Sequence, residues 1–481
     1  MSTETMTRLL SAACLCLLAS AAGAASAQKQ MTVPALPDAP PARLISRADM
    51  PQADAAMHAA PDTAAASAQD AGALPRLTRT QAEQMAVKNN PRISASHLLA
   101  LAQHQVVRET RAAELPAFTG SITAMDAEDA SRISAGSLTA SRLFEHAGAG
   151  GGFTQLLTDF GRTRNLVASS KLQEKAQNAG ALATIEDIVL ATDQAFYDAL
   201  EAQALLQVAQ QNVTTRQTTD DQVGQMTKNK LKSTLDLSFA DVNLSQAKLL
   251  LLDAQNNADS TMAALDDVLG LDKLVKYELV EQHADAPAPP PDVELLIQTG
   301  LQQRPDLQAL QYNQQAAVKY SHAERDQMLP SISAAGTAGS VPIRPAAYYN
   351  ENWWGGIGVN MTIPLFNGFL YSSQAKEASL RAQAEGEQGR ALRDRIVRDV
   401  RTSWLAANTA FQRVAVTADL LQEANLALTL AQTRYRLGLS SIVELSQAQY
   451  QQTDAAIRHT NASYQYRLAL AALNYQTGAT P

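Results

Sequence analysis

The sequence has few of the thiol groups that could form disulfides, bind metals or act as nucleophiles. Its two cysteines, Cys14 and Cys16, both lie near the N-terminus. There, Arg8, an apolar run over residues 9–22 and the small residues 25–27 match a cleavable secretory signal. Cleavage near residue 28 would leave a mature chain without cysteine. A lipoprotein-type cleavage before Cys14 is the less favoured alternative, because too little apolar sequence precedes it.

Long hydrophobic runs are also missing after the signal. No stretch approaches the ~18 apolar residues of a membrane-spanning helix, since even the run over residues 249–252 ends at Asp253. Only 18% of residues are charged and the formal net charge is -8, which argues against a nucleic-acid partner. Abundant alanine, glutamine and leucine favour a mainly helical protein. Residues 28–77 are rich in alanine and proline without a sustained period, and we expect a disordered leader there.

Groups of catalytic or metal-binding residues are equally scarce. The seven histidines are scattered without paired zinc-ligand spacing, and no serine or cysteine nucleophile motif is present. The glycine-rich segment 148–152 lacks the lysine of a phosphate-binding loop. The sequence therefore predicts a protein that is not an enzyme and that uses no metal or cofactor.

The chain contains one long internal repeat. A shift of 214 residues places Pro91 on Pro305, and a shift of 208 places Asp236 on Glu444. The pattern predicts a first unit over 78–280 and a second over 292–481, and residues 281–291 form a proline-rich linker between them. A repeat of this length indicates duplication rather than a short-period solenoid.

Each unit is expected to begin with one helix of roughly 35 residues, over 79–114 and 292–328, which stops at a Leu-Pro pair. Strands should follow, then very long helices over about 167–227 and 372–436, each with a returning helix. About 65 helical residues span on the order of 100 Å. In the second long helix, apolar residues recur at spacings of three and four, as in a coiled coil: Val397, Val400, Trp404, Ala407, Phe411, Val414, Ala418 and Leu421.

A strand in the second unit has the period expected when one face meets lipid and the other meets water. Its apolar residues Ile357, Val359, Met361 and Ile363 alternate with Gly358, Asn360 and Thr362. An aromatic cluster precedes it, namely Tyr348, Tyr349, Trp353 and Trp354. Such residues suit a membrane–water interface, and a packed loop is nearly as good an interpretation.

The order of elements and three short segments resemble the TolC family of outer-membrane efflux proteins over about residues 78–479. The most specific segment is 433–448, TRYRLGLSSIVELSQA, and residues 366–368 and 159–161 resemble the family motif between strand and helix. The resemblance implies a mainly α fold with a membrane β-barrel in the outer membrane of a Gram-negative bacterium. Each of three identical chains would give four strands to a shared 12-stranded β-barrel in outer-membrane lipid, and its helices to a periplasmic α-barrel.

The resemblance also implies partners and a role. The homotrimer would be the exit duct of a tripartite efflux pump or a type I secretion system, joined to a periplasmic adaptor and an inner-membrane pump. The alternative from the residues alone is a structural periplasmic coiled coil or an adhesive envelope protein without channel activity. The sequence does not select the substrate, although the absence of a methionine or histidine cluster disfavours metals.

By position, the family's periplasmic gate corresponds to Asp236, Tyr435 and Glu444. The alternative for the two carboxylates is that they are ordinary helix-start residues favoured by the helix dipole. The adaptor-docking tip would comprise Leu437, Gly438, Leu439 and Ser440.

Two departures from the family pattern bear on the gate and the tips. A second acidic ring would fall at Gln447, and a gate-linking arginine at Ser440. Lys230 stands where Gly438 stands in the second unit, so the two hairpin tips are expected to differ in shape.

Overall fold

The computed structural model describes residues 75–126, 132–133, 141–142, 146–271, 277–281, 287–343 and 352–479. The predicted signal, most of the predicted leader, and Tyr348 and Tyr349 lie outside these ranges. The described residues start at Pro75, so the last three residues of the segment assigned to the leader are described, and two of them, Arg76 and Leu77, belong to strand β1. None of the helices within these ranges combines the length and apolar character needed to cross a membrane.

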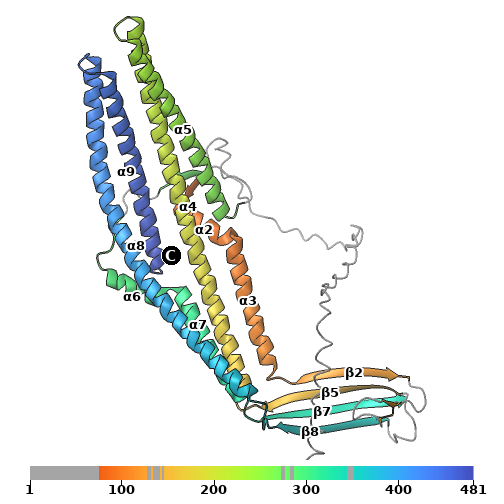
Figure 1. Cartoon of the computed structure of the whole chain (residues 1–481). Helices are drawn as coiled ribbons and strands as arrows, with labels where there is room; N and C mark the ends of the chain where they lie inside the picture. Colours follow the sequence, from red (N-terminus) through yellow and green to blue (C-terminus); the bar gives the residue numbers. More distant parts are fainter. Residues whose placement is uncertain are drawn as a thin grey trace, which may run out of the picture. The chain divides into compact units, whose positions relative to one another are not determined.

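The two units contain helices of the same lengths in the same order (Figure 1). The first unit holds α2 (Arg79–Asn89), α3 (Pro91–Ala112), α4 (Arg162–Lys228) and α5 (Thr234–Val268). The second holds α6 (Val293–Gln303), α7 (Pro305–Asp326), α8 (Leu370–Arg436) and α9 (Ile442–Gln476). The lengths are 11, 22, 67 and 35 residues in both units. This agreement extends the sequence repeat to the level of whole elements.

The prediction of one 35-residue helix at the start of each unit was wrong. Both helices break at the residue before a proline, where Asn90 and Arg304 are extended with ψ of 123° and 122°. The proline ring clashes with a preceding residue in helical conformation, and Pro91 and Pro305 instead take the first position of a new helix. The expected stop before each Leu-Pro pair is present.

Four long strands form one antiparallel sheet in the order β2-β5-β7-β8. They are β2 (Ala117–Met125), β5 (His146–Thr158), β7 (Ser331–Ile343) and β8 (Trp353–Thr362). Two short parallel strands, β1 (Arg76–Thr78) and β6 (Glu278–Val280), pair with each other, as do the antiparallel β3 (Arg132–Ile133) and β4 (Ser141–Arg142). Each unit thus contributes two neighbouring strands to the large sheet.

The register divides the sheet into an apolar face and a polar face, since directly paired residues share a face. The apolar face carries Phe118, Ile122, Phe153, Trp353, Ile357, Val359 and Met361. The polar face carries Thr119, Ser121, Ser333, Thr337, Trp354, Asn360 and Thr362. The predicted alternation is therefore confirmed from Ile357 to Thr362, whereas Ile363 lies one residue beyond β8. The two adjacent tryptophans lie on opposite faces, so only Trp353 shares the face of the apolar residues.

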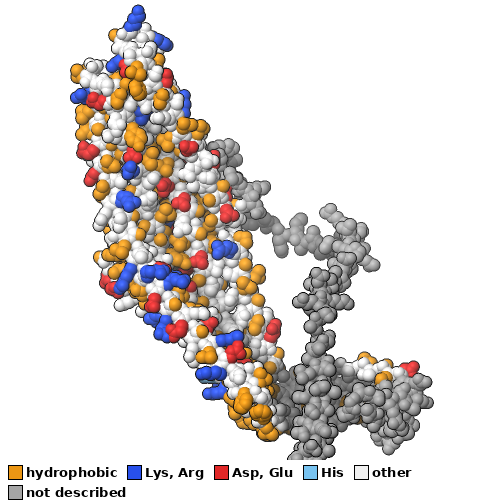
Figure 2. All heavy atoms as spheres, in the orientation of Figure 1, with side chains coloured by type: hydrophobic (Ala, Val, Ile, Leu, Met, Phe, Trp, Pro, Cys, Tyr) orange, Lys and Arg blue, Asp and Glu red, His pale blue; other side chains and the backbone are white. Residues whose placement is uncertain are grey.

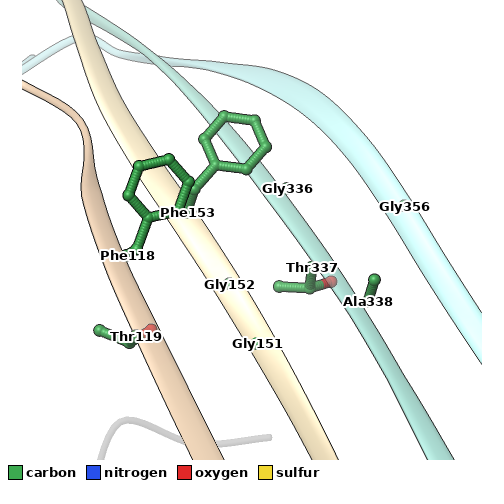
Figure 3. A pocket seen from close by; sticks show the side chains of 9 residues that line it. All are labelled: Phe118, Thr119, Gly151, Gly152, Phe153, Gly336, Thr337, Ala338 and Gly356. Atoms are coloured by element: carbon green, nitrogen blue, oxygen red, sulfur yellow. The ribbon is translucent and has the colours of Figure 1, made fainter.

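Glycines on both faces leave room for aromatic side chains. Phe118 and Phe153 pack on the apolar face with ring centroids 6.1 Å apart, and a Cβ at Gly336 would collide with the Phe153 ring. Residues Gly151, Gly152 and Gly356 help to line an apolar hollow of about 300 Å³ beside these rings (Figure 3). Cross-strand aromatic–glycine pairs of this kind help to fix strand register.

The long helices pack along lines of small and branched residues. Equivalent positions are buried in both units, such as Ile188 with Ile396 and Ala199 with Ala407. The predicted coiled-coil line of α8 is only partly buried: Val400 and Ala407 are in the core, whereas Phe411 is 41% exposed. Further along the helix the buried line moves to Thr417, Ala424 and Ala431. These three residues again recur at intervals of seven, on a line that is displaced from the predicted one.

One buried charged cluster is present in the first unit alone. Arg79 of α2 lies 3.3 Å from Glu83 and 3.2 Å from Asp193 of α4, and both carboxylates are more than nine-tenths buried. Burial is the main reason that the pKa of Asp193 is raised to about 7, with the neighbouring Glu83 adding to the rise. In the second unit the equivalent positions hold Val293, Ile297 and Arg401. The packing of these helices therefore does not require the acidic pair.

This cluster predicts a pH-dependent stability. The pKa of Asp193 is raised from 3.8 to about 7, so the folded protein binds a proton that the unfolded chain has already released between these pH values. Stability should fall as pH rises from about 4 through about 7. Asp193→Asn should remove most of this fall and stabilise the protein at pH 8, by on the order of 1–4 kcal/mol. Thermal unfolding of the detergent-extracted protein at pH 5 and pH 8 measures it.

The exposed carboxylate of Asp253 offers a matched control. Asp253→Asn should leave the pH profile as in the wild type. An Asp193→Asn protein whose unfolding temperature still falls by the wild-type amount between the two pH values would contradict the assignment.

Candidate functional site: the ends of the two helical hairpins

Helices α4 and α5, and helices α8 and α9, form two hairpins that each end in a tight reversal (Figure 1). We call residues 229–233 the first tip and residues 437–441 the second tip. Leu231 N donates to Met226 O at 2.8 Å, and the equivalent Leu439 N donates to Arg434 O at 2.8 Å. The 67-residue helices α4 and α8 separate both tips from the sheet.

The prediction that the two tips differ in shape was wrong. Lys230 adopts a positive φ of 59°, close to the 72° of Gly438, and both tips close with the same hydrogen bonds. The hydrogen bonds that close the reversal compensate for the ~1–2 kcal/mol that a residue with a Cβ costs in the left-handed conformation. The tips therefore differ in side chains and not in backbone.

The two predicted gate carboxylates both stand in the first turn of a returning helix. Asp236 N donates to Ser233 Oγ at 3.1 Å, and Ser233 N donates back to the Asp236 carboxylate at 3.2 Å, which completes a capping box. Glu444 N donates to Ser441 Oγ, but its carboxylate lies 3.1 Å from Arg434 Nε. Asp236 thus has a local structural role, whereas Glu444 is turned toward the neighbouring helix of its hairpin.

Tyr435, the third predicted gate residue, lies where the two hairpins meet. It is 3% exposed and packs with Val223 and Ala240 of the first hairpin and Ile442 of its own. The Lys232 ammonium lies 4.3 Å from its ring centroid. Burial, and to a lesser extent the charge of Asp236, raises the pKa of the Tyr435 phenol. The structure thus brings Tyr435 and Asp236 together across the two hairpins.

The Tyr435 hydroxyl is buried without a hydrogen-bond partner among the described residues. A buried polar group in this condition costs about 1–3 kcal/mol. The neighbouring Ser440 hydroxyl is in the same condition. These two groups are the polar atoms of the hairpin ends that a second molecule or a rearrangement could satisfy.

The predicted docking residues differ in what they present to solvent. Leu437 and Leu439 are about two-thirds exposed, and Gly438 is exposed between them. Ser440 is half-buried. The outer surface of the second tip is therefore formed by two leucines around a glycine turn.

A polar seam between the hairpins was missed by the sequence analysis. Arg216 of α4 is 7% exposed and donates to Gln449 of α9 at 2.7 Å, and Gln449 donates to Thr219 at 2.9 Å. Burial lowers the pKa of Arg216. Thr453 donates to Asn212 at 3.2 Å beside a cavity of about 270 Å³. The repeat contained a signal for this seam: the charged Arg216 of the first unit aligns with Ala424 of the second, so the two units differ at this position.

Metal chemistry gains no support from the described residues. Within them no three or more histidine, cysteine, aspartate or glutamate side chains are grouped as metal ligands.

Comparison with known proteins places this architecture in one family. The model of the outer membrane efflux protein family matches residues 82–271 and 296–479. The chain belongs to this family. It is therefore an outer-membrane efflux channel protein that extends into the periplasm, as the resemblance implied.

Individual relatives agree with this assignment. The chain is 25% identical over 346 residues to the outer membrane protein TolC of Salmonella enteritidis, covering 68% of this chain and 67% of that protein. It is 22% identical over 411 residues to the outer membrane efflux protein BepC of Brucella suis biovar 1, covering 83% and 85%. The fold is similar to the CmeC outer membrane channel of Campylobacter jejuni, with a TM-score of 0.73 at 18% identity over 83% of this chain and 85% of that one.

The polar seam of this efflux protein generates a second prediction. Gln449→Ala leaves the Arg216 guanidinium buried with one side-chain partner fewer, and should destabilise the protein by about 1–3 kcal/mol. Arg216→Ala reproduces the alanine of the second unit and should cost less in the absence of Gln449 than in its presence. A double-mutant cycle by thermal unfolding measures the coupling.

Asn243→Ala, which removes the 2.9 Å hydrogen bond to Ser446 elsewhere between the hairpins, serves as the comparison. Its effect should add to that of Gln449→Ala. Full additivity of Arg216→Ala and Gln449→Ala would show that the buried pair does not hold the hairpins together.

Proposed function

We propose that this efflux protein acts as a homotrimer that forms the exit duct of a tripartite efflux pump or a type I secretion system. The observation that carries the proposal is the four-stranded sheet with one apolar face and one polar face. Such a face pattern suits a wall between lipid and a water-filled lumen. Four strands are too few to close a barrel alone, since transmembrane barrels begin at about eight.

The edges of the sheet support closure by identical neighbours. Among the described strands, β2 pairs only with β5, and β8 pairs only with β7. Unpaired backbone groups cannot remain exposed to hydrocarbon. Pairing of β8 in one copy with β2 in the next leaves no open edge after three copies and gives 12 strands.

The helices support the same cyclic arrangement. Within the chain α4 packs against α9 and α7, but the equivalent helix α8 has no comparable packing against α5 or α3 among the described residues. Leucines on these helices are exposed, including Leu249 and Leu252 of α5 and Leu426 and Leu430 of α8. Figure 2 shows hydrophobic side chains along the length of the helices. Contact between α8 of one copy and α3 and α5 of the next would repeat the packing of α4 against α7 and α9 within one chain.

The periplasmic end of the duct is the proposed gate, formed by Asp236, Tyr435 and Glu444. A threefold axis would turn each carboxylate into a ring of three, which attracts cations at a constriction. Tyr435 supports this role because its buried hydroxyl has no partner in the described part of one chain. A rearrangement of the hairpins, or a contact from another copy, would satisfy it.

The exposed leucines and glycine of the second tip are the proposed docking surface for a periplasmic adaptor, with Ser440 behind them. Such a surface fits a helical partner. Leu437 and Leu439 offer apolar contacts, and Gly438 between them has no side chain to hold a helix away. The energy for transport would come from an inner-membrane pump, and the channel itself would be passive. Trp353 is the first residue of β8 and lies on the apolar face of the sheet, a position that fits a membrane–water interface.

The first test is the mass of the signal-cleaved protein extracted from the outer membrane, corrected for bound detergent. A trimer that needs detergent to stay in solution is expected, because both sheet edges and the apolar face require partners. A detergent-free monomer or dimer from the periplasm would instead support a structural coiled coil or an adhesive envelope protein.

The gate has its own prediction in planar bilayers. Asp236→Asn with Glu444→Gln keeps the side-chain shapes and removes two negative rings, so the preference for cations over anions should fall. The reversal potential in a salt gradient measures this. Arg434→Gln, which frees the Glu444 carboxylate, is the matched control and should shift the potential in the opposite direction. An unchanged potential in both proteins would exclude these carboxylates from the narrow part of the pore.

A further inference from the structure

Trp354 is placed differently from every other large aromatic residue of the sheet. Its neighbour Trp353 points to the apolar face with Phe118 and Phe153, whereas Trp354 lies on the polar face. In the described strands it is the only phenylalanine, tyrosine or tryptophan on that face. Its surroundings there are threonine, serine, asparagine and glycine. Burial of apolar surface against lipid therefore does not explain its position.

Two glycines hold the indole against the backbone. Gly339 is paired directly with Trp354, and Gly150 is paired with Gly339 on the next strand. A Cβ built on Gly339 would lie 2.8 Å from indole Cζ2, and a Cβ on Gly150 would lie 3.2 Å from the same atom. Strands lie about 4.8 Å apart, so a side chain from β8 that reaches β5 must lean along the sheet. The six-membered ring of the indole therefore lies close to both glycines.

The Trp354 side chain is only partly covered. Trp354 is 48% exposed although its ring covers two glycines of neighbouring strands. It is the second residue of β8, at the end of the strand away from helix α8.

We propose that Trp354 forms a binding site for flat aromatic cations at the outer mouth of the channel. This inference rests on the proposed trimeric channel, in which the polar face lines the lumen and three indoles face it. The indole is the side chain whose face attracts cations best, and an aromatic cation adds stacking on the same surface. A solute of this class would bind weakly and reversibly to each indole on its way out of the duct.

The glycines make the site testable without removing the aromatic ring. Gly339→Ala places a methyl group 2.8 Å from indole Cζ2 and also 2.8 Å from the Ala149 carbonyl oxygen, so it should displace the ring and shift β5 against β7. Gly148→Ala controls for the shift, because its methyl group would meet the Ser340 carbonyl oxygen of β7 at the same distance without meeting the indole. Gly356→Ala is the matched control, because Gly356 is on the same face of the sheet and a Cβ there meets nothing within 4 Å. Trp353→Ala is the control for the loss of a tryptophan from the apolar face.

The experiment is a calorimetric titration of the detergent-solubilised protein with N-methylacridinium, with micelles alone as the blank. Trp354→Ala and Gly339→Ala should weaken binding by roughly two- to fivefold, whereas Trp354→Phe should retain part of the affinity. Gly356→Ala and Trp353→Ala should bind as the wild type does. Tetrabutylammonium, a cation without aromatic rings, should bind more weakly and respond less to Trp354→Ala.

A second measurement follows Trp354 directly. The chain has three tryptophans, so Trp353→Phe with Trp404→Phe leaves Trp354 as the only one. Saturable quenching of its fluorescence by N-methylacridinium should give the affinity found by calorimetry, and Gly339→Ala should weaken it.

The outcomes separate this inference from the proposed function. If the protein is a conducting trimer but Trp354→Ala binds N-methylacridinium with wild-type affinity, the indole site is wrong and the channel stands. Equal losses in Trp353→Ala and Trp354→Ala would also overturn it, because they would indicate binding at the lipid-facing surface. If the protein is neither trimeric nor conducting, the proposed function itself fails. The trimer mass of every variant shows that the sheet has assembled.

Discussion

The backbone groups at the two edges of the large sheet need hydrogen-bond partners, and this need constrains the rest of the protein. The sheet has four strands, an apolar face and a polar face, and edges at β2 and β8 that have no partner among the described strands. In an outer-membrane protein those edges must be paired, because hydrocarbon cannot satisfy backbone groups. Cyclic pairing between copies is the simplest solution, since each chain offers one edge from each unit. In the proposed trimer the copies would be fixed in a ring at the sheet, and the long helices that leave it would be brought side by side as well.

Comparison of the two units separates the residues that the shared fold requires from those that are specific to one unit. Helix lengths and core residues such as Ile188 and Ile396 agree between the units, so they represent the requirements of packing. The acidic pair of Glu83 and Asp193 is replaced by Ile297 and Arg401, and the buried Arg216 is replaced by Ala424. The second of these differences occurs where the two units have different neighbours within the chain. Arg216 lies in the contact between α4 and α9, whereas Ala424 lies on α8, which has no comparably extensive contact with α5 among the described residues.

Much of the fold could be predicted from the sequence because it rests on local signals. The repeat, the long helices and the alternation in β8 were read from residue spacing, and the structure agrees. The break at Pro91 was missed because the helical pattern continues on both sides of it, although a proline restricts the residue before it. The equal backbone of the two tips was missed for a different reason. Lys230 adopts the left-handed conformation because hydrogen bonds of the surrounding turn hold it there, and a residue preference of ~1–2 kcal/mol does not reveal them.

The hairpin ends and Trp354 show why the candidate sites were harder to predict than the fold. The family resemblance assigned Asp236, Tyr435 and Glu444 to one gate, but it could not show that Asp236 caps its own helix or that Tyr435 is buried between the hairpins. Trp354 was grouped with Trp353 in a cluster expected to precede the strand. The structure instead makes them the first two residues of β8, where neighbours along the strand point to opposite faces. The same alternation that suits one tryptophan to the lipid boundary directs the next one to the polar face. There the glycines of two other strands, more than ten residues away in sequence, determine how its ring lies.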